Sequence, residues 1–232
     1  MIFPCIDLME GKVVQLVQGR EKALEGDGPE EMLRKFAGFP EIQVIDLDAA
    51  IGRGSNDDLV RMLASKAATR VGGGVRDAAR ALALVEQGAR KVIVGTSAFT
   101  KDGINEPLLS EIRDAIGRER LIVAVDSKGG RIVVKGWREA TDLMAESVLG
   151  ALEPYCSGFL CTYVDKEGMM QGTDLDWFRR LRNATSRELT AAGGITTYDD
   201  VRALLAMDVH AALGMAVYTG KLSLAVLRNL TS

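Results

Sequence analysis

The chain has 232 residues, of which 47% are hydrophobic and 26% charged, and its formal net charge is −3. This composition is typical of a globular protein with an apolar core, and it offers no basic surface for nucleic acid. No apolar run approaches the roughly 18 residues that a membrane-spanning helix needs, so we expect a cytoplasmic protein with neither nucleic acid nor membrane as a partner. The three cysteines lack the spacing of a metal site, and we expect them to be reduced and buried.

Short β-rich segments alternate along the chain with segments whose apolar residues recur at helical spacing. The predicted strands cover residues 2–6, 42–47, 70–71, 91–94, 121–125, 159–162, 188–191 and 211–213. The predicted helices cover residues 78–87, 105–116, 142–152, 174–181, 198–206 and 222–230. This alternation predicts a parallel sheet with helices outside it, either as an open doubly wound sheet or as a closed barrel. His210, just before the last strand, is expected to be a solvated loop residue.

The sequence repeats after about half its length, and the repeat favours the closed barrel. Residues 7–12 and 46–48 align with residues 126–131 and 165–167 at an offset of 119. A glycine-rich turn at residue 73 recurs at residue 193. Eight strand–helix units and this repeat predict a single-domain α/β protein, a (β/α)₈ TIM barrel built from two half-barrels, approximately 1–119 and 120–232.

Two aspartates occupy equivalent positions in the two halves. In a barrel, chemistry is carried at the carboxyl ends of the strands, and Asp7 and Asp126 end the first and fifth predicted strands, half a turn apart around the mouth. Each could instead cap a helix or pair with a lysine. Two acids that face each other across a pocket are what acid/base catalysis needs, because one can donate a proton while the other removes one.

Glycine turns follow the third, fourth, seventh and eighth predicted strands. Backbone N–H groups at such turns can converge on phosphate oxygens, although a single glycine turn often serves only the packing of strand against helix. Two symmetric pairs of turns predict two phosphate sites, and hence a substrate with a phosphate at each end. The candidate phosphate-binding residues are Gly73, Gly74, Arg76, Gly95, Thr96, Gly193, Gly194, Gly214 and Met215.

Motifs along nearly the whole chain are similar to those of one known family. They are Ile6-Asp7-Leu8, Val44-Ile45-Asp46-Leu47-Asp48, Gly72-Gly73-Gly74-Val75-Arg76, Lys135-Gly136-Trp137 after Asp126, and Ala192-Gly193-Gly194-Ile195. The chain thus resembles the histidine-biosynthesis isomerase family, the phosphoribosyl-formimino-aminoimidazole-carboxamide ribotide isomerases. Lys135-Gly136-Trp137 is the most discriminating motif, because it is similar to the isomerase and not to the related cyclase.

The resemblance implies an Amadori rearrangement, from aminoaldose to aminoketose, by a monomer that acts on a bisphosphorylated small molecule without cofactor or metal. It implies that Asp7 is the base and Asp126 the acid, or the reverse, and that Thr162 orients the opened sugar. Residues that could support the site are Gln15, Gln18, Asp46, Asp48, Trp137 and Glu167.

The chain departs from the family pattern at a few positions. Gln15 stands where the family usually has arginine, Glu167-Gly168-Met169 stands for Asp-Gly-Thr, and Ile42 or Gln43 replaces a histidine. Three other functions therefore remain open: the cyclase subunit of imidazole glycerol phosphate synthase, a bifunctional isomerase that also acts on phosphoribosyl anthranilate, and a non-catalytic barrel that binds phosphate ligands.

Overall fold

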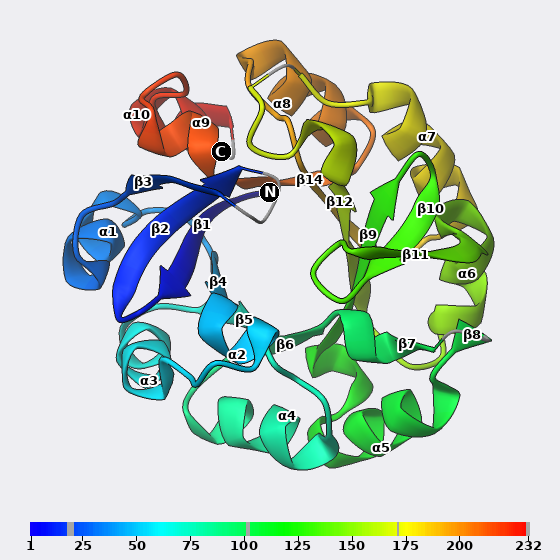
Figure 1. The fold of residues 1–232 in the computed structure, drawn as a ribbon. Coiled ribbons are helices and arrows are strands. Elements are labelled where there is room, and N and C mark those ends of the chain that lie inside the picture. The colour runs from blue at the N-terminus through cyan, green and yellow to red at the C-terminus, as the bar shows by residue number, and fades with distance from the viewer. Residues whose placement is uncertain (18–20, 101–102, 171, 231–232) are drawn as a thin grey trace.

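A closed barrel of parallel strands forms the centre of the protein, as seen in a computed structural model that describes residues 1–17, 21–100, 103–170 and 172–230 (Figure 1). The barrel closes because β14 pairs with β1 and β6 pairs with β9, each in parallel. In order around the ring, the strands are β1 (Ile2–Met9), β4 (Ile42–Asp46), β5 (Thr69–Gly72), β6 (Lys91–Val94), β9 (Leu121–Lys128), β12 (Gly158–Tyr163), β13 (Glu188–Ala192) and β14 (His210–Leu213).

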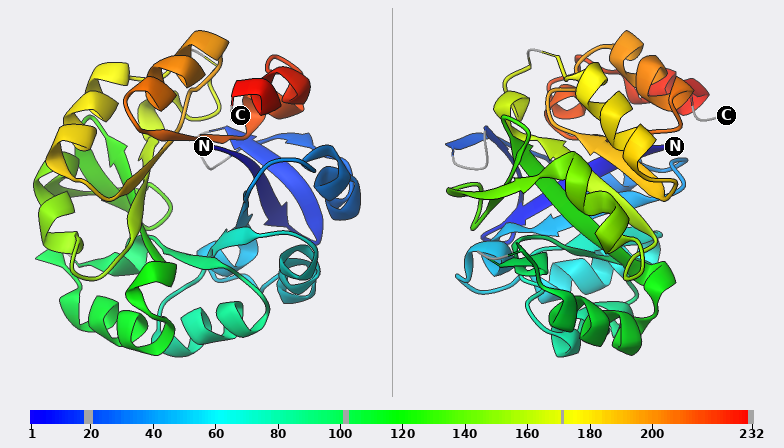
Figure 2. Two further views of the ribbon diagram at one scale, coloured as in Figure 1. Left: turned by 180° about the vertical axis from the view of Figure 1, so that it is seen from behind. Right: turned by 90° about the vertical axis from the view of Figure 1, so that its right-hand side faces the viewer.

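Helices form a ring around the barrel (Figure 2). They are α1 (Pro29–Lys35), α3 (Asp57–Lys66), α4 (Ala78–Glu86), α5 (Glu106–Ile116), α6 (Ala145–Leu152), α7 (Leu175–Ala184), α8 (Tyr198–Ala206) and α10 (Leu224–Leu230). The short helices α2 (Leu47–Ile51) and α9 (Met215–Tyr218) and the 3₁₀ turns η1 (Thr96–Ala98), η2 (Arg118–Arg120) and η3 (Val164–Lys166) lie in the connections. Within the described residues, no helix has the length and apolar character needed to cross a membrane.

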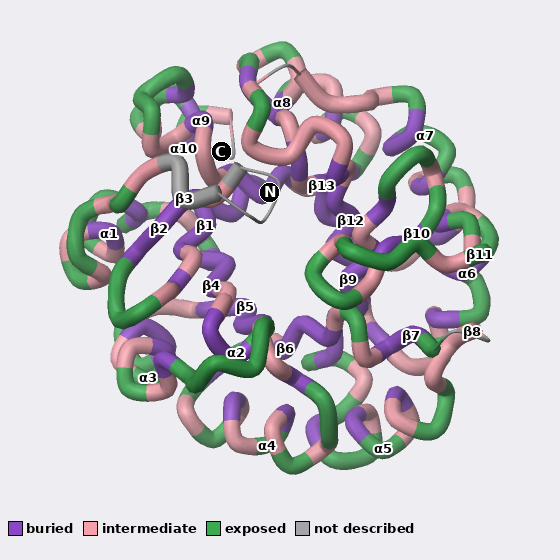
Figure 3. Tube along the Cα trace, in the orientation of Figure 1, coloured by how far each residue is buried: buried purple, intermediate pink, exposed green. Residues whose placement is uncertain are grey.

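The apolar residues separate into two cores. The main core lies between strands and helices, where residues such as Trp177 and Phe178 are almost fully buried. A smaller cluster of Cys5, Ile93, Ile122, Ala124, Leu160 and Ala212 fills the inside of the barrel. Figure 3 shows the resulting pattern, with buried strands surrounded by helices whose outer faces are exposed. Such a filled barrel leaves only its rim for binding and chemistry.

All eight predicted strand positions are confirmed, but several predicted boundaries are wrong. Leu47 begins α2 instead of ending a strand, because the Asp46 side chain accepts a hydrogen bond from Ala49 N at 3.1 Å and caps that helix. Residues 142–144 belong to a strand, and α6 begins only at Ala145. The last helix begins at Leu224, two residues later than predicted. The outer helices α1 and α3 were not among the predicted segments.

Two β-hairpins extend the first and fifth barrel strands beyond the barrel. The first joins β1 to β2 (Lys12–Val17) and continues into β3 (Glu21–Glu25), whereas the second joins β9 to β10 (Arg131–Val134) and continues into β11 (Glu139–Met144). Both project from the same end of the barrel (Figure 2). Sequence reasoning missed the hairpins, and Asp7 and Asp126 therefore lie two residues before the ends of their strands. The two remaining strands, β7 (Phe99–Thr100) and β8 (Gly103–Ile104), form a separate small hairpin.

A buried charged network closes the opposite end of the barrel, where the strands begin. Arg70 has no exposed surface, and its Nη2 atom lies 2.7 Å from Glu41 Oε2 and 2.9 Å from Glu188 Oε1. Its guanidinium carbon lies 3.6 Å from the centre of the Phe3 ring. Lys91 also pairs with Glu188, at 2.7 Å. Because Arg70 and Glu188 come from opposite halves of the chain, this network ties the two halves together.

The sequence suggested that His210 lies in a solvated loop. In the structure it lies beside this charged network instead. It is the first residue of β14, and its ring packs edge-on against Phe3 with 5.4 Å between centroids. Burial lowers the pKa of His210 to about 4, so the ring is neutral at neutral pH. The residue belongs to the closed end of the barrel, far along the strands from the two aspartates.

We expect Arg70→Met to destabilise the protein by about 3–5 kcal/mol, because it leaves the buried Glu41 carboxylate without its main partner. Urea unfolding followed by circular dichroism measures the change. Arg118→Ala, which removes an exposed pair with Glu119, is the control and should cost less than about 1 kcal/mol. A cost below about 1 kcal/mol for Arg70→Met would show that the network adds little to stability.

Candidate active site

Asp7 and Asp126 stand at the mouth of the barrel, on the strands that continue into the two hairpins. Asp7 is paired in register with Ile45 of β4 and Val14 of β2, and Asp126 with Thr162 of β12. Both carboxyl groups are partly buried. Burial raises the pKa of Asp7 from 3.8 to about 7 and also raises the pKa of Asp126. Desolvation thus brings the Asp7 carboxyl into the range in which it can accept and release a proton near neutral pH.

Glu167 is the third carboxyl group of the mouth. It directly follows η3, which comes after β12, and it is partly buried. Burial, together with the charges of Asp7 and Asp126, raises its pKa from 4.5 to about 8. The repulsion from both aspartates places the three carboxyls in one electrostatic cluster. A carboxyl with a pKa of about 8 is mostly protonated at neutral pH.

Two hydrogen-bond donors hold Asp126. Trp137 Nε1 donates to Asp126 Oδ2 at 2.8 Å, and Thr162 also donates to this carboxylate. Both bonds oppose the effect of burial on the pKa of Asp126, because they stabilise its charged form. Thr162, the residue expected to orient the sugar, thus lies beside Asp126 on the neighbouring strand.

The turn between β10 and β11 carries Trp137 over the mouth. Lys135, Gly136 and Trp137 all have positive φ, at 54°, 65° and 64°. Lys135 N donates to Thr96 Oγ1 at 3.0 Å, so this turn is also fixed to the glycine turn after β6. A non-glycine residue with positive φ costs energy and persists where its surroundings hold it. The conformation brings the indole of Trp137 onto Asp126.

Asp46 and Asp48 lie next to the mouth, but their carboxylates are occupied by the protein itself. Asp46 caps α2 and accepts from Asn56, and Asp48 Oδ2 accepts from Glu10 N at 2.6 Å. These partners give the two acids a structural role. Asn56 was missed by sequence reasoning, because its neighbours in the network come from distant parts of the chain.

Two of the candidate phosphate-binding positions, Gly73 and Gly193, must be glycine because their surroundings leave no room for a side chain. A Cβ atom on Gly73 would lie 2.1 Å from Asp46 O, and one on Gly193 would lie 2.5 Å from Tyr163 O. Their neighbours Gly74 and Gly194 have φ values of 69° and 74°. Both glycine pairs therefore bring their turns into contact with the preceding strand connection, at equivalent places in the two halves.

Gly95 and Gly214 precede the short helical turns η1 and α9, which begin at Thr96 and Met215. Near Gly95, an added Cβ would meet only Ala124 Cβ, at 3.9 Å. Near Gly214, it would meet Gln15 Oε1 at 2.4 Å. The amide of Gln15 is buried and its Nε2 atom donates to Val14 O at 2.9 Å, so this side chain lies against the turn after β14.

Arg76 does not turn toward a glycine turn in this conformation. Its guanidinium donates to Ala49 O at 3.1 Å and to Ala50 O at 2.8 Å, near the end of α2. These carbonyls carry the negative end of the helix dipole, which an arginine stabilises. Gln18, another candidate from the sequence, lies outside the described residues.

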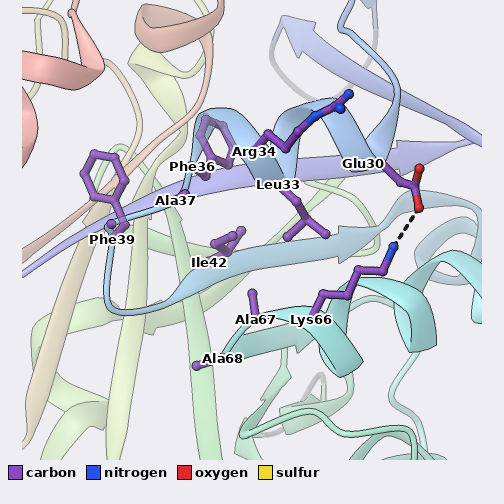
Figure 4. Close-up of a pocket in the computed structure, with 11 residues that line it drawn as sticks. Glu30, Leu33, Arg34, Phe36, Ala37, Phe39, Ile42, Lys66, Ala67 and Ala68 are labelled. Atoms are coloured by element: carbon purple, nitrogen blue, oxygen red, sulfur yellow. Dashed lines mark hydrogen bonds and ion pairs between the residues drawn. The ribbon is translucent and has the colours of Figure 1, made fainter.

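One groove lies on the outside of the barrel (Figure 4), and none of Asp7, Asp126 and Glu167 lines it. It has a volume of about 540 Å³ and runs between α1 and α3, beside the ion pair of Lys66 and Glu30 at 2.6 Å. Over the described part of the chain, His, Cys, Asp and Glu side chains form no group of three that could hold a metal ion.

Comparison with known proteins points to one family. A family model described as "Histidine biosynthesis protein" matches residues 1–223. A protein of Methanocaldococcus jannaschii is 35% identical over 231 residues, which cover 97% of this chain and 96% of the relative. A protein of Myxococcus xanthus is 40% identical over 228 residues, 94% of each chain. Both relatives are named 1-(5-phosphoribosyl)-5-((5-phosphoribosylamino)methylideneamino) imidazole-4-carboxamide isomerase.

The raised pKa of Glu167 predicts how stability depends on pH. A carboxyl whose pKa is higher in the folded protein than in the unfolded chain binds more protons when folded, so stability falls as pH rises from about 4.5 to about 8. Glu167→Gln removes this loss. We expect it to raise Tm by roughly 2–4 °C at about pH 9, equivalent to at least about 1 kcal/mol, and by less at about pH 5.

Thermal unfolding at the two pH values measures this effect. Glu86→Gln, on an exposed face of α4, is the matched control and should change Tm equally little at both. An effect of Glu167→Gln that is the same at both pH values would contradict the raised pKa.

Proposed function

The chain belongs to the histidine biosynthesis protein family, and we propose that Asp7, Asp126 and Glu167 divide the acid and base steps of its reaction. The protein is a phosphoribosyl-formimino-aminoimidazole-carboxamide ribotide isomerase, an aldose–ketose isomerase of histidine biosynthesis. The observation that carries the division of roles is the cluster of three partly buried carboxyls, whose environments separate their affinities for protons.

The rearrangement needs a proton donor and a proton acceptor on the same sugar. The donor protonates the ring oxygen of the aminoaldose, the ring opens, and a C1′–N double bond forms. The acceptor then removes the proton from C2′, and the electrons of that bond move toward the nitrogen to give an enolamine. The enol becomes the C2′ ketone when C1′ takes up a proton and the hydroxyl at C2′ releases its own. Each proton transfer is one that a positioned carboxyl can perform.

Asp7 fits the role of base. Its pKa of about 7 leaves an appreciable ionised fraction at neutral pH, and makes that carboxylate a stronger base than an ordinary aspartate. Glu167 fits the role of acid, because with a pKa of about 8 it is protonated under the same conditions. The opposite protonation states of two neighbouring carboxyls are a common arrangement for acid and base pairs.

Asp126 is held in the cluster by two hydrogen-bond donors. Trp137 and Thr162 fix its orientation toward the mouth, and we assign it a share of the donor role with Glu167. Trp137 also supports isomerase over cyclase activity. Lys135-Gly136-Trp137 is the motif that distinguishes the two activities, and Trp137 donates a hydrogen bond to the Asp126 carboxylate.

We further propose that two pairs of turns hold the two phosphates through backbone N–H groups. One pair is Gly73–Gly74 with Gly95–Thr96, and the other is Gly193–Gly194 with Gly214–Met215. The division into half-barrels, the monomeric state and the cytoplasmic location stay predictions.

Changing each carboxyl separately tests the assignment. We expect Asp7→Asn, Asp126→Asn and Glu167→Gln each to lower kcat for the ribotide by at least about 10², the scale of a lost general acid or base. Spectrophotometric turnover measures the loss, and circular dichroism checks the fold. Asp114→Asn, which removes an exposed ion pair with Arg113 on α5, is the control and should keep kcat.

Near-native kcat in any of the three variants would remove that residue from the mechanism. If the unmodified protein binds the ribotide but does not turn it over, the chain is instead a non-catalytic binding barrel. Phosphoribosyl anthranilate, assayed in parallel, should not be converted, because bifunctional relatives tend to have arginine where Lys135 stands.

The phosphate assignment predicts where small anions bind. Crystals soaked in inorganic phosphate should show an anion at both pairs of glycine turns, held mainly by backbone N–H groups. Phosphate should also inhibit turnover in competition with the substrate. An anion at only one of the two pairs, under saturating phosphate, would contradict a site for a bisphosphate.

A further inference from the structure

The tip of the β1–β2 hairpin is fixed to side chains from a different part of the chain. The tip consists of Glu10 and Gly11, with φ values of 52° and 74°, between the paired residues Met9 and Lys12. Positive φ at both central positions is typical of tight two-residue turns. Glu10 N donates to Asp48 Oδ2 at 2.6 Å, and Gly11 N donates to Asn56 Oδ1 at 2.9 Å. Both backbone N–H groups of the turn are thus held by the segment that follows β4.

Asn56 is the centre of this contact. It occupies the position before α3 where a side chain usually caps a helix, but its side chain makes no cap hydrogen bond. Instead, its Nδ2 atom donates to Asp46 Oδ1 at 2.8 Å and to Asp48 Oδ2 at 2.9 Å, and its backbone N donates to Asp46 Oδ2 at 2.7 Å. The three side chains are at most 9% exposed. One amide therefore satisfies two buried carboxylates and anchors the hairpin as well.

We propose that Asn56 is a positioning residue, which holds the β1–β2 hairpin so that Asp7 and Gln15 face the mouth. The proposal rests on the role assigned to Asp7 above. Asp7 and Gln15 lie on the two strands of this hairpin, and Asp7 is paired with Val14 across it. An asparagine is needed because its amide donates to the two acids while its oxygen accepts from Gly11. Aspartate cannot donate in its charged form, and an apolar residue can do neither.

The second half of the chain anchors its hairpin differently. At the β9–β10 tip, Gly129 N donates to Asp165 Oδ2 at 2.8 Å, and Gly130 O accepts from Ala145 N at 3.1 Å. Offset by 119 residues, Asn56 falls on Leu175, which cannot form such a network. The equivalent of Asp48 is Glu167, whose carboxyl belongs to the cluster with Asp7 and Asp126. Asn56 thus binds Asp48, whose equivalent in the second half is Glu167, one of the carboxyls to which we assign a proton-transfer role.

Asn56→Ala tests the proposal by its effect on turnover relative to stability. We expect kcat to fall at least about tenfold with little change in KM, because a shifted base affects the proton transfer more than ground-state binding. Thr185→Ala is the matched control, since it removes a buried hydrogen bond to Glu153 at the opposite end of the barrel. It should lower Tm and leave kcat unchanged. Asn56→Gln, which keeps the amide, should recover part of kcat.

The pH profile separates a positioning role from a loss of stability. The groups near the Asp7 carboxyl are Cys5 on its own strand, Glu167 after β12 and Tyr218 of α9. A loosened hairpin admits water to Asp7, which lowers its pKa, so the acid limb of kcat/KM should move to lower pH in Asn56→Ala and stay in place in Thr185→Ala. Wild-type kcat and an unmoved limb in folded Asn56→Ala would overturn the proposal.

Hydrogen exchange tests the anchor without relying on turnover. The Glu10 and Gly11 amides should exchange slowly in the unmodified protein, and the Gly11 amide should exchange at least about tenfold faster in Asn56→Ala. If Asn56→Ala does not fold, Asp48→Asn is the test variant instead. In that variant the Glu10 amide, which donates to Asp48, should exchange faster. Fast exchange at both amides in the unmodified protein would refute the anchor, even if the ribotide is turned over. Slow exchange in a protein that lacks turnover would instead leave the anchor standing and refute the proposed roles of the carboxyls.

Discussion

Water is partly excluded from three carboxyl groups that share the mouth of the barrel, and the rest of the site depends on this constraint. Carboxyls in such surroundings bind protons more tightly, which raises the pKa of Asp7 to about 7 and that of Glu167 to about 8. The three groups cannot all be charged at once without strong repulsion. An arrangement that is unfavourable for stability is therefore favourable for moving protons at neutral pH.

The protein places its stabilising charges and its reactive charges at opposite ends of the same strands. At the closed end, Arg70 neutralises Glu41 and Glu188, and the buried charges there are paired. At the mouth, Asp126 is held by the neutral donors Trp137 and Thr162, and no described cation forms an ion pair with Asp7, Asp126 or Glu167. A lysine or arginine in the mouth would lower the pKa values of these acids and remove their capacity to exchange protons. The separation keeps fold stability and catalysis from competing for the same groups.

The two halves of the chain use the same elements for different purposes. Each half extends its first strand into a hairpin, with Asp7 or Asp126 at its base and a tight turn at its tip. In the first half, Asn56 and Asp48 hold the tip, whereas in the second half Asp165 does so and Glu167 turns to the mouth. If the two halves were identical, Asp48 and its equivalent Glu167 would either both hold a hairpin tip or both join Asp7 and Asp126 at the mouth. The observed asymmetry leaves three acids at the mouth, to which we assign separate donor and base roles.

The sequence by itself determined the eight strands, the closed barrel, and the equivalent placement of Asp7 and Asp126, because periodicity, turn glycines and the internal repeat are local or regular signals. It also marked Glu167 as a departure from the family pattern, at a position that follows η3 in the structure. Only the tertiary structure decided that Arg76 caps α2, that His210 is buried, and that residues 142–144 form a hairpin strand. It alone joined Asn56 to Gly11 across 45 residues and Arg70 to Glu188 across 118. These outcomes depend on which distant segments come into contact, and the energies of buried charges and hydrogen bonds are fixed only when those contacts form.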